Sequence, residues 1–194
     1  MSKHILIAVT NISRWGEHDK PTGLWFGELT HFVDAVEQAG HTWELCSPKG
    51  GAIPLDPRSL GWMFMKASDK ALRADESFMA RLQNTQATDD VDASGFDAIF
   101  YAGGHGTMWD FPDDLSLQRI AAEIHQRGGF VAAVCHGVSG LLNQTPKSMI
   151  VVTTDVSSGH DSMIPIVVVG ASPSSFVWLL PSDFDSASRG YGVE

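Results

Sequence analysis

Three consecutive residues, Cys135, His136 and Gly137, form the part of the chain best suited to covalent chemistry. The uninterrupted apolar run at residues 131–134 predicts a central strand of a parallel sheet, buried on both faces. Gly137 and Gly140 then predict a sharp turn into a helix. A thiol on such a turn stands above the sheet, and the N-terminus of the helix is expected to lower its pKa. We therefore expect Cys135 to be a nucleophile.

The residue beside this thiol strengthens that interpretation. A free cysteine is equally compatible with a small buried core residue, so Cys135 alone does not decide between the two. His136 follows it directly and is expected to act as a general acid or base and to hold the thiolate. The pair favours catalysis over simple burial.

A second glycine-rich turn follows another predicted strand, at residues 97–101. It contains four candidate binding residues, Gly103, Gly104, His105 and Gly106. Because the carboxyl ends of parallel strands share one edge of a sheet, we expect this turn to lie beside the cysteine. Its backbone N–H groups, with that of the residue after the cysteine, are expected to form an oxyanion hole. The histidine of the turn is equally compatible with facing the site and with a structural role.

A carboxylate from the first predicted helix is the third candidate. Glu28 lies in a helix expected over residues 25–39, among the apolar neighbours Trp25, Phe26 and Leu29. Partial burial would raise its pKa and let a protonated carboxyl donate to the sulfur or shuttle a proton. The alternative is an ordinary solvated helix residue.

The elements that must position these groups alternate between strand and helix. Strands are expected at residues 4–10 and 42–46, on either side of the first helix, and a later helix within residues 110–126. This order predicts an α/β fold, a three-layer sandwich with a mostly parallel sheet and helices on both faces.

The stretch at residues 54–93 interrupts this alternation and is interpreted as a lid-like insertion. Its helical part carries an apolar set that predicts either a lid or chaperone-like surface, or simply core. That set is Trp62, Met63, Phe64, Met65, Phe78, Met79 and Leu82.

Composition limits the classes of function. The chain has 194 residues, 43% hydrophobic and 19% charged, which suits a single globular domain over residues 1–194. The net charge of −10, without a lysine or arginine cluster, argues against nucleic acid and anionic membranes as partners. Two cysteines imply no disulfide framework, and we expect a reducing, cytoplasmic setting.

Cofactor signals are missing from the sequence. No cysteine and histidine spacing is typical of a zinc site, so no metal is expected. The glycine turn at residues 103–106 has neither a P-loop lysine nor Rossmann spacing, which argues against a nucleotide.

At these residues the chain resembles the ThiJ/PfpI family of the class I glutamine amidotransferase-like superfamily. The matching segments are Ala-Ala-Val-Cys-His-Gly at 132–137, Tyr-Ala-Gly-Gly-His-Gly-Thr at 101–107 with Asp110 and Pro112, Ser-Pro-Lys-Gly-Gly at 47–51 with Pro54, Asp56 and Pro57, and Gly27-Glu28. The glycine turn and the long insertion are most similar to the branch of heat-shock chaperones and glutathione-independent glyoxalases.

The resemblance implies a flavodoxin-like sandwich, usually a homodimer, that converts methylglyoxal to lactate without glutathione, with deglycation and stress-protection roles. By this analogy Cys135 attacks a small reactive aldehyde to give a hemithioacetal. Glu28 moves a proton between the adjacent carbons, His136 supports the thiolate, and no cofactor is needed.

The segment at residues 144–194 departs from this family pattern. It is interpreted as an atypical, shortened or frame-shifted terminus, and no acidic partner for His136 is identified in it. Three rival functions therefore stay open: a redox-sensing or holdase chaperone, a cysteine peptidase or amidase, and an inactive homologue. In the chaperone interpretation, Cys135 is oxidised and the apolar stretch at residues 60–82 binds clients.

Overall fold

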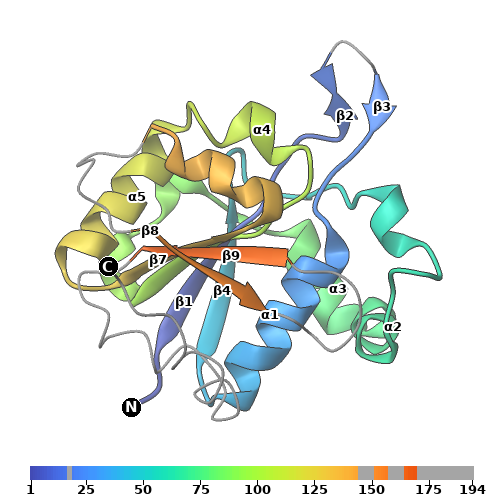
Figure 1. Ribbon diagram of the computed structural model, residues 1–194, viewed down its shortest axis with the longest axis horizontal. Helices are drawn as coiled ribbons and strands as arrows, with labels where there is room; N and C mark the ends of the chain where they lie inside the picture. The colour runs from blue at the N-terminus through green and yellow to red at the C-terminus, as the bar shows by residue number, and fades with distance from the viewer. Residues whose placement is uncertain (17–18, 144–150, 157–163, 170–194) are drawn as a thin grey trace.

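A seven-stranded sheet forms the centre of the computed structural model, which describes residues 1–16, 19–143, 151–156 and 164–169 (Figure 1). Neighbouring strands follow an order that differs from the chain order, because helices cross over between parallel strands. From one edge to the other the strands are β5 (Gln86–Ala87), β4 (Thr42–Ser47), β1 (His4–Ala8), β6 (Ala98–Tyr101), β7 (Phe130–Val134), β9 (Ile164–Val169) and β8 (Val151–Val156).

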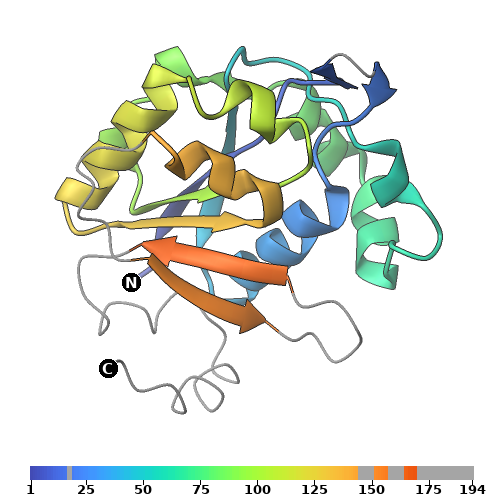
Figure 2. The ribbon, with the colours of Figure 1, turned by 45° about the horizontal axis from the view of Figure 1, so that its top comes forward.

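The first five of these strands, from β5 to β7, run parallel, as the sequence predicts. β9 then pairs antiparallel with β7, and β8 pairs antiparallel with β9 (Figure 2). The atypical C-terminal segment thus contributes two strands that extend the sheet beyond the one leading to Cys135. The rest of that segment lies outside the described residues.

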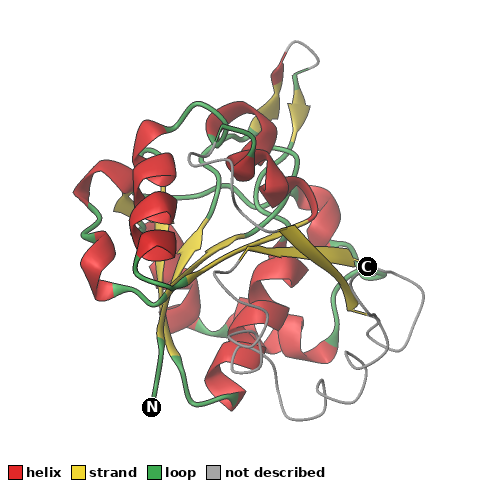
Figure 3. Cartoon of the chain, turned by 60° about the vertical axis from the view of Figure 1, so that its left-hand side comes forward, coloured by secondary structure: helices red, strands yellow, loops and turns green. Residues whose placement is uncertain are grey.

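Helices cover both faces of the sheet (Figure 3). In β1 the alternating side chains pack into two cores: Ile5 and Ile7 face one, and Leu6 and Ala8 face the other. All four are fully buried, as expected for a parallel strand covered on both sides. The first core also takes side chains from α1 (Phe26–Gln38) and α3 (Glu76–Gln83), and the second takes them from α5 (Leu115–Gln126).

The lid-like insertion is divided between core and surface. Phe78 and Leu82 of α3 are buried in the first core, whereas Trp62, Met63 and Phe64 are 84%, 70% and 51% exposed. The apolar residues of the insertion therefore do not form a single exposed surface: some belong to the core and others face solvent. The remaining elements of the insertion are η2 (Pro57–Leu60), α2 (Ala67–Ala74), η3 (Thr88–Asp90) and η4 (Ala93–Gly95).

Short elements surround the carboxyl ends of β1, β6 and β7. A hairpin of β2 (Arg14–Trp15) and β3 (Lys20–Pro21) follows β1, α4 (Thr107–Asp110) follows β6, and the 3-10 helix η5 (Cys135–Leu141) follows β7. Within the described residues, no helix is both long and apolar enough to cross a membrane.

Candidate active site

Cys135 occupies a strained turn at the end of β7. Its φ of +50° lies in the left-handed region, which a non-glycine residue seldom adopts, while Val134 before it is extended. Two residues later the chain passes so close to the Tyr101 carbonyl that a Cβ atom on Gly137 would overlap it. The predicted nucleophile elbow is therefore present, followed by a 3-10 helix.

The Cys135 sulfur contacts the ring of the next residue. Sγ lies 3.1 Å from Nδ1 of His136, and both residues are half-buried. Burial raises the pKa of the Cys135 thiol to about 11, and the nearby Glu28 carboxylate acts in the same direction. The backbone N–H of His136 lowers this pKa, but only enough to offset part of the increase. Burial, and then the Arg58 guanidinium, lower the pKa of His136. The expectation of a lowered thiol pKa is wrong: thiol and imidazole are both neutral at rest.

Glu28 lies in the first turn of α1 and is only 8% exposed. Burial raises its pKa to about 7, although the Cys135 thiol and the Gly103 N–H both act to lower it. Its Oε2 atom is buried and makes no well-formed hydrogen bond within the described part of the chain. The prediction of a raised pKa is confirmed, and the solvated alternative is wrong. A carboxyl group poised between its two protonation states thus lies beside the thiol.

The glycine turn after β6 allows this close packing. A Cβ atom on Gly103 would overlap Glu28 Oε2 and lie 2.8 Å from the Val134 carbonyl oxygen. Gly104 has a φ of +115°, and the Gly103 carbonyl accepts a hydrogen bond of 3.1 Å from the Trp25 N–H. The turn, the elbow and the start of α1 therefore meet at one edge of the sheet, as predicted.

The ring of His105, in the same turn, lies beside that of His136. Its ring centroid lies 4.2 Å from that of His136, and its Nδ1 lies 3.0 Å from Nη2 of Arg58. Arg58 in turn donates from Nε and Nη2 to the Asp56 carboxylate, over 3.0 and 2.6 Å. Arg58 was missed from the sequence, where residues 54–93 are interpreted only as a lid-like insertion.

A family model described as DJ-1/PfpI matches residues 27–161, which is more than half of the chain. The chain belongs to the DJ-1/PfpI family. The match includes Glu28, the glycine turn at 103–106 and the Cys135 elbow, the three pieces that the fold brings together.

Two curated relatives are named glyoxalases. Glyoxalase 3 of Candida albicans is 32% identical over 136 residues, and the glutathione-independent glyoxalase HSP31 of Saccharomyces cerevisiae is 32% identical over 138 residues. The alignments cover 69% and 70% of this chain but 57% and 58% of the relatives. The chain therefore spans somewhat more than half the length of these relatives.

Solved structures agree with the flavodoxin-like fold of this DJ-1/PfpI chain. Glyoxalase III from Candida albicans matches with a TM-score of 0.67 and 30% identity, covering 75% of this chain and 62% of that one. Rapid Encystment Protein 24 KDa from Francisella tularensis matches with a TM-score of 0.70 and 33% identity, covering 75% and 64%. The predicted fold class is confirmed.

A second buried carboxylate, that of Asp110, connects the segment after β1 to the helix that follows the glycine turn. Asp110, at the end of α4, accepts hydrogen bonds from Thr10 Oγ1 and from the Asn11 N–H, each at 2.8 Å. Burial raises its pKa to about 6, more than these hydrogen bonds lower it. A Cβ atom on Gly106 would lie 2.8 Å from the same Thr10 hydroxyl oxygen. Asp110 therefore joins the ends of β1 and α4 beneath the turn.

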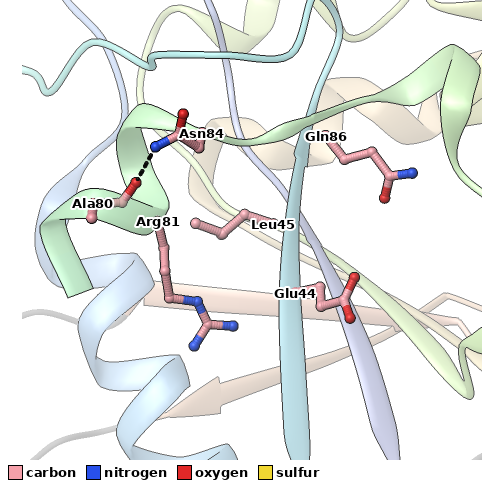
Figure 4. A pocket seen from close by; sticks show the side chains of 6 residues that line it. All are labelled: Glu44, Leu45, Ala80, Arg81, Asn84 and Gln86. Atoms are coloured by element: carbon pink, nitrogen blue, oxygen red, sulfur yellow. Dashed lines mark hydrogen bonds between the residues drawn. The ribbon is translucent and has the colours of Figure 1, made fainter. Parts of the chain in front are cut away.

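A hollow of about 380 Å³ lies elsewhere, between β4, β5 and α3 (Figure 4). None of its lining residues belongs to the predicted site; they are Glu44, Leu45, Ala80, Arg81, Asn84 and Gln86.

Across the described ranges, no three histidine, cysteine, aspartate or glutamate side chains gather as metal ligands would.

Proposed function

We propose that this chain is a glutathione-independent glyoxalase of the lyase class, which converts methylglyoxal and water to lactate. The observation that carries the proposal is the buried Glu28 carboxyl, with a pKa of about 7, beside the Cys135 thiol. A nucleophile and a base of intermediate strength are the two groups that an internal proton transfer in a 2-oxoaldehyde requires. The names of the relatives support the same reaction.

The first step forms a carbon–sulfur bond. As the thiol attacks the aldehyde carbon, His136, whose Nδ1 lies 3.1 Å from Sγ, takes the thiol proton and then passes it to the former aldehyde oxygen. The backbone N–H groups of Gly104 and His136 stabilise the developing negative charge on that oxygen. The product is a neutral hemithioacetal, which accounts for every proton without a pre-formed thiolate.

Glu28 performs the second step. In its ionised form it removes the proton from the carbon bonded to sulfur, which leaves an enediolate, and it returns that proton to the neighbouring carbon. The hydroxyl proton of the hemithioacetal passes at the same stage to the oxygen on that neighbouring carbon, so that the oxygen beside sulfur becomes the thioester carbonyl. The result is a thioester of lactate on Cys135, which water hydrolyses to free lactate and the starting thiol. The reaction consumes one water and no oxidant. Burial of Glu28 serves this step, because a carboxylate with a raised pKa is a stronger base.

Methylglyoxal consumption by the purified chain without glutathione tests the proposal. We expect turnover in the wild type, a loss of at least about 10³-fold in Cys135→Ser, and near-normal turnover in Cys46→Ala. Cys46 is the matched control because it is the other free cysteine and lies fully buried in the second core. Full activity of Cys135→Ser, or no turnover by a folded wild type, would contradict the proposal.

The proposal also includes a homodimer in a cytoplasmic, reducing setting. It rests on the family resemblance and on two free cysteines, Cys46 and Cys135, in a chain without a described disulfide. Light scattering during size-exclusion chromatography tests the assembly: a mass of twice 21.0 kDa is expected, and a mass of 21.0 kDa contradicts it.

A holdase function is a second candidate, because Trp62, Met63 and Phe64 are consecutive, apolar and exposed. If these residues bind unfolded clients, suppression of client aggregation should survive Cys135→Ser and be lost in a Trp62→Ser, Phe64→Ser variant. The opposite pattern would remove this candidate and leave the glyoxalase.

A further inference from the structure

The contact between Arg58 and His105 specifies where the histidine carries its proton. A guanidinium group has only donors, and it stays charged in proteins. Nη2 of Arg58 lies 3.0 Å from Nδ1 of His105, so Nδ1 must accept this hydrogen bond. An imidazole whose Nδ1 accepts is neutral and carries its single proton on Nε2.

Arg58 is itself held in place. Its Nε and Nη2 atoms form a two-pronged hydrogen bond with Asp56, whose side chain is fully buried. The Thr22 hydroxyl and the Arg58 backbone N–H also donate to this carboxylate, over 3.1 and 2.9 Å. Burial alone would raise the pKa of Asp56, but these hydrogen bonds outweigh it and lower the pKa. The carboxylate is therefore ionised at neutral pH and fixes the guanidinium.

The two histidines of the site, His105 and His136, lie too close together for both rings to be protonated easily. The ring centroids of His105 and His136 lie 4.2 Å apart, so a proton on one ring opposes a proton on the other. Burial, the other histidine and Arg58 all lower the pKa of His105, while Asp56 acts to raise it. For His136, burial and Arg58 act in the same downward direction.

We propose that Arg58 is a positioning residue, which fixes His105 as the neutral tautomer protonated on Nε2 and so keeps His136 uncharged and able to accept the Cys135 proton. The proposal deepens the glyoxalase function and rests on it for the role of His136. The charged and titratable groups facing this pair are Arg58, Asp56 and Cys135. Arg58 touches none of the reacting atoms and acts through the histidines.

Nitrogen NMR of the full chain labelled at histidine tests the proposal directly. In the wild type we expect His105 to show a protonated Nε2 and an unprotonated Nδ1, assigned by comparison with His105→Gln. In Arg58→Met, which keeps the length of the side chain but removes the donors, we expect a mixture of tautomers and a higher His105 pKa. Arg58→Lys, which keeps a donor and the charge, should restore part of the wild-type pattern.

Arg73→Met is the matched control, because Arg73 is an exposed arginine on the neighbouring helix α2 and should leave His105 unchanged. A wild-type His105 protonated on Nδ1 would overturn the proposal even if Arg58→Met failed to fold. An unchanged tautomer and pKa in a folded Arg58→Met would overturn it as well.

Turnover separates this proposal from the glyoxalase function. The NMR pattern needs no substrate, so a wild type without turnover but with the expected tautomer would contradict only the proposed function. With turnover, the acid limb of kcat/KM should move to higher pH in Arg58→Met and stay in place in Arg73→Met. An acid limb that does not move would contradict the role assigned to Arg58.

Discussion

Sγ of Cys135 lies 3.1 Å from Nδ1 of His136, its immediate neighbour in the chain. Successive side chains of a strand point to opposite faces, so this contact depends on the turn between the two residues. The positive φ of Cys135 supplies that turn at the point where β7 ends. The strain therefore has a chemical use, since it places a thiol and its base within hydrogen-bond distance.

Alkylation should report the neutral resting state of this pair. With a thiol pKa of about 11, reaction of Cys135 with iodoacetamide should be slow at pH 7 and about tenfold faster for each pH unit above it. In Glu28→Gln the carboxylate that raises this pKa is absent, so the rate at pH 8 should increase about tenfold. Mass spectrometry of labelled peptides provides the measurement.

Cys46 is the internal control for that experiment. It is fully buried, and burial raises the pKa of its thiol strongly, so only Cys135 should be labelled in the folded chain. Rapid labelling of Cys135 at pH 7 would mean that a thiolate exists at rest, contrary to the site electrostatics.

The sequence predicts the elbow well because its signals are local. An apolar run at residues 131–134 followed by a polar pair and glycines specifies strand, turn and helix without reference to the rest of the chain. The raised pKa of Glu28 follows in the same way, because its apolar neighbours in the helix indicate burial.

Contacts between distant segments could not be predicted in this way. The thiol pKa depends on burial and then on the charge of Glu28, a residue more than 100 positions earlier that the fold brings to the elbow. His105 and Arg58 are 47 residues apart, and the short 3-10 helix η2 that carries Arg58 has no sequence periodicity to indicate where its side chains point. Phe78 and Phe64 look alike in sequence, yet one packs into the core and the other is half exposed.

Glu28 should also make stability depend on pH. Its pKa rises from 4.5 in the unfolded chain to about 7 in the folded one, so folding favours the protonated form. Stability from this group is therefore fully present below about pH 4.5 and is lost as the pH rises through 7. The difference corresponds to about 3 kcal/mol in the free energy of unfolding.

Urea denaturation of the wild type and Glu28→Gln across pH 4.5 to 8 isolates this effect, because other groups contribute equally to both. The variant should gain about 3 kcal/mol relative to the wild type at pH 8, while losing about 10²–10⁴-fold in turnover. Parallel stability curves would show that Glu28 titrates at its ordinary pKa.

Gly103 should tolerate no side chain. In Gly103→Ala the new methyl group would meet Glu28 Oε2, the Val134 carbonyl oxygen and the Cys135 Cβ at once. Overpacking at a buried backbone costs about 1–3 kcal/mol, and displacement of two catalytic candidates should remove most turnover. Gly95→Ala is the control, because nothing lies within 4 Å of its Cβ position. Equal thermal unfolding and turnover in the two variants would show that the turn can move aside.

Asp69 should be the most sensitive residue of the joint between α1 and α2. Its side chain is fully buried and accepts hydrogen bonds from the Thr30 hydroxyl and the Lys66 N–H, and His31 Nε2 lies 3.3 Å away. Asp69→Ala would leave buried donors without partners, which should cost about 3 kcal/mol of stability. Because α1 carries Glu28, turnover should fall as well.

Asp75→Ala offers a matched comparison for that variant. Asp75 caps the N-terminus of α3 by accepting from the Ser77 and Phe78 N–H groups, but its side chain is exposed. Its loss frays one helix end and leaves α1 in place, so the decrease in stability should be smaller and turnover should stay near the wild-type value. Denaturant unfolding together with methylglyoxal consumption distinguishes the two. If Asp75→Ala proved the more damaging substitution, the α1–α2 joint would not be what holds Glu28 against Cys135.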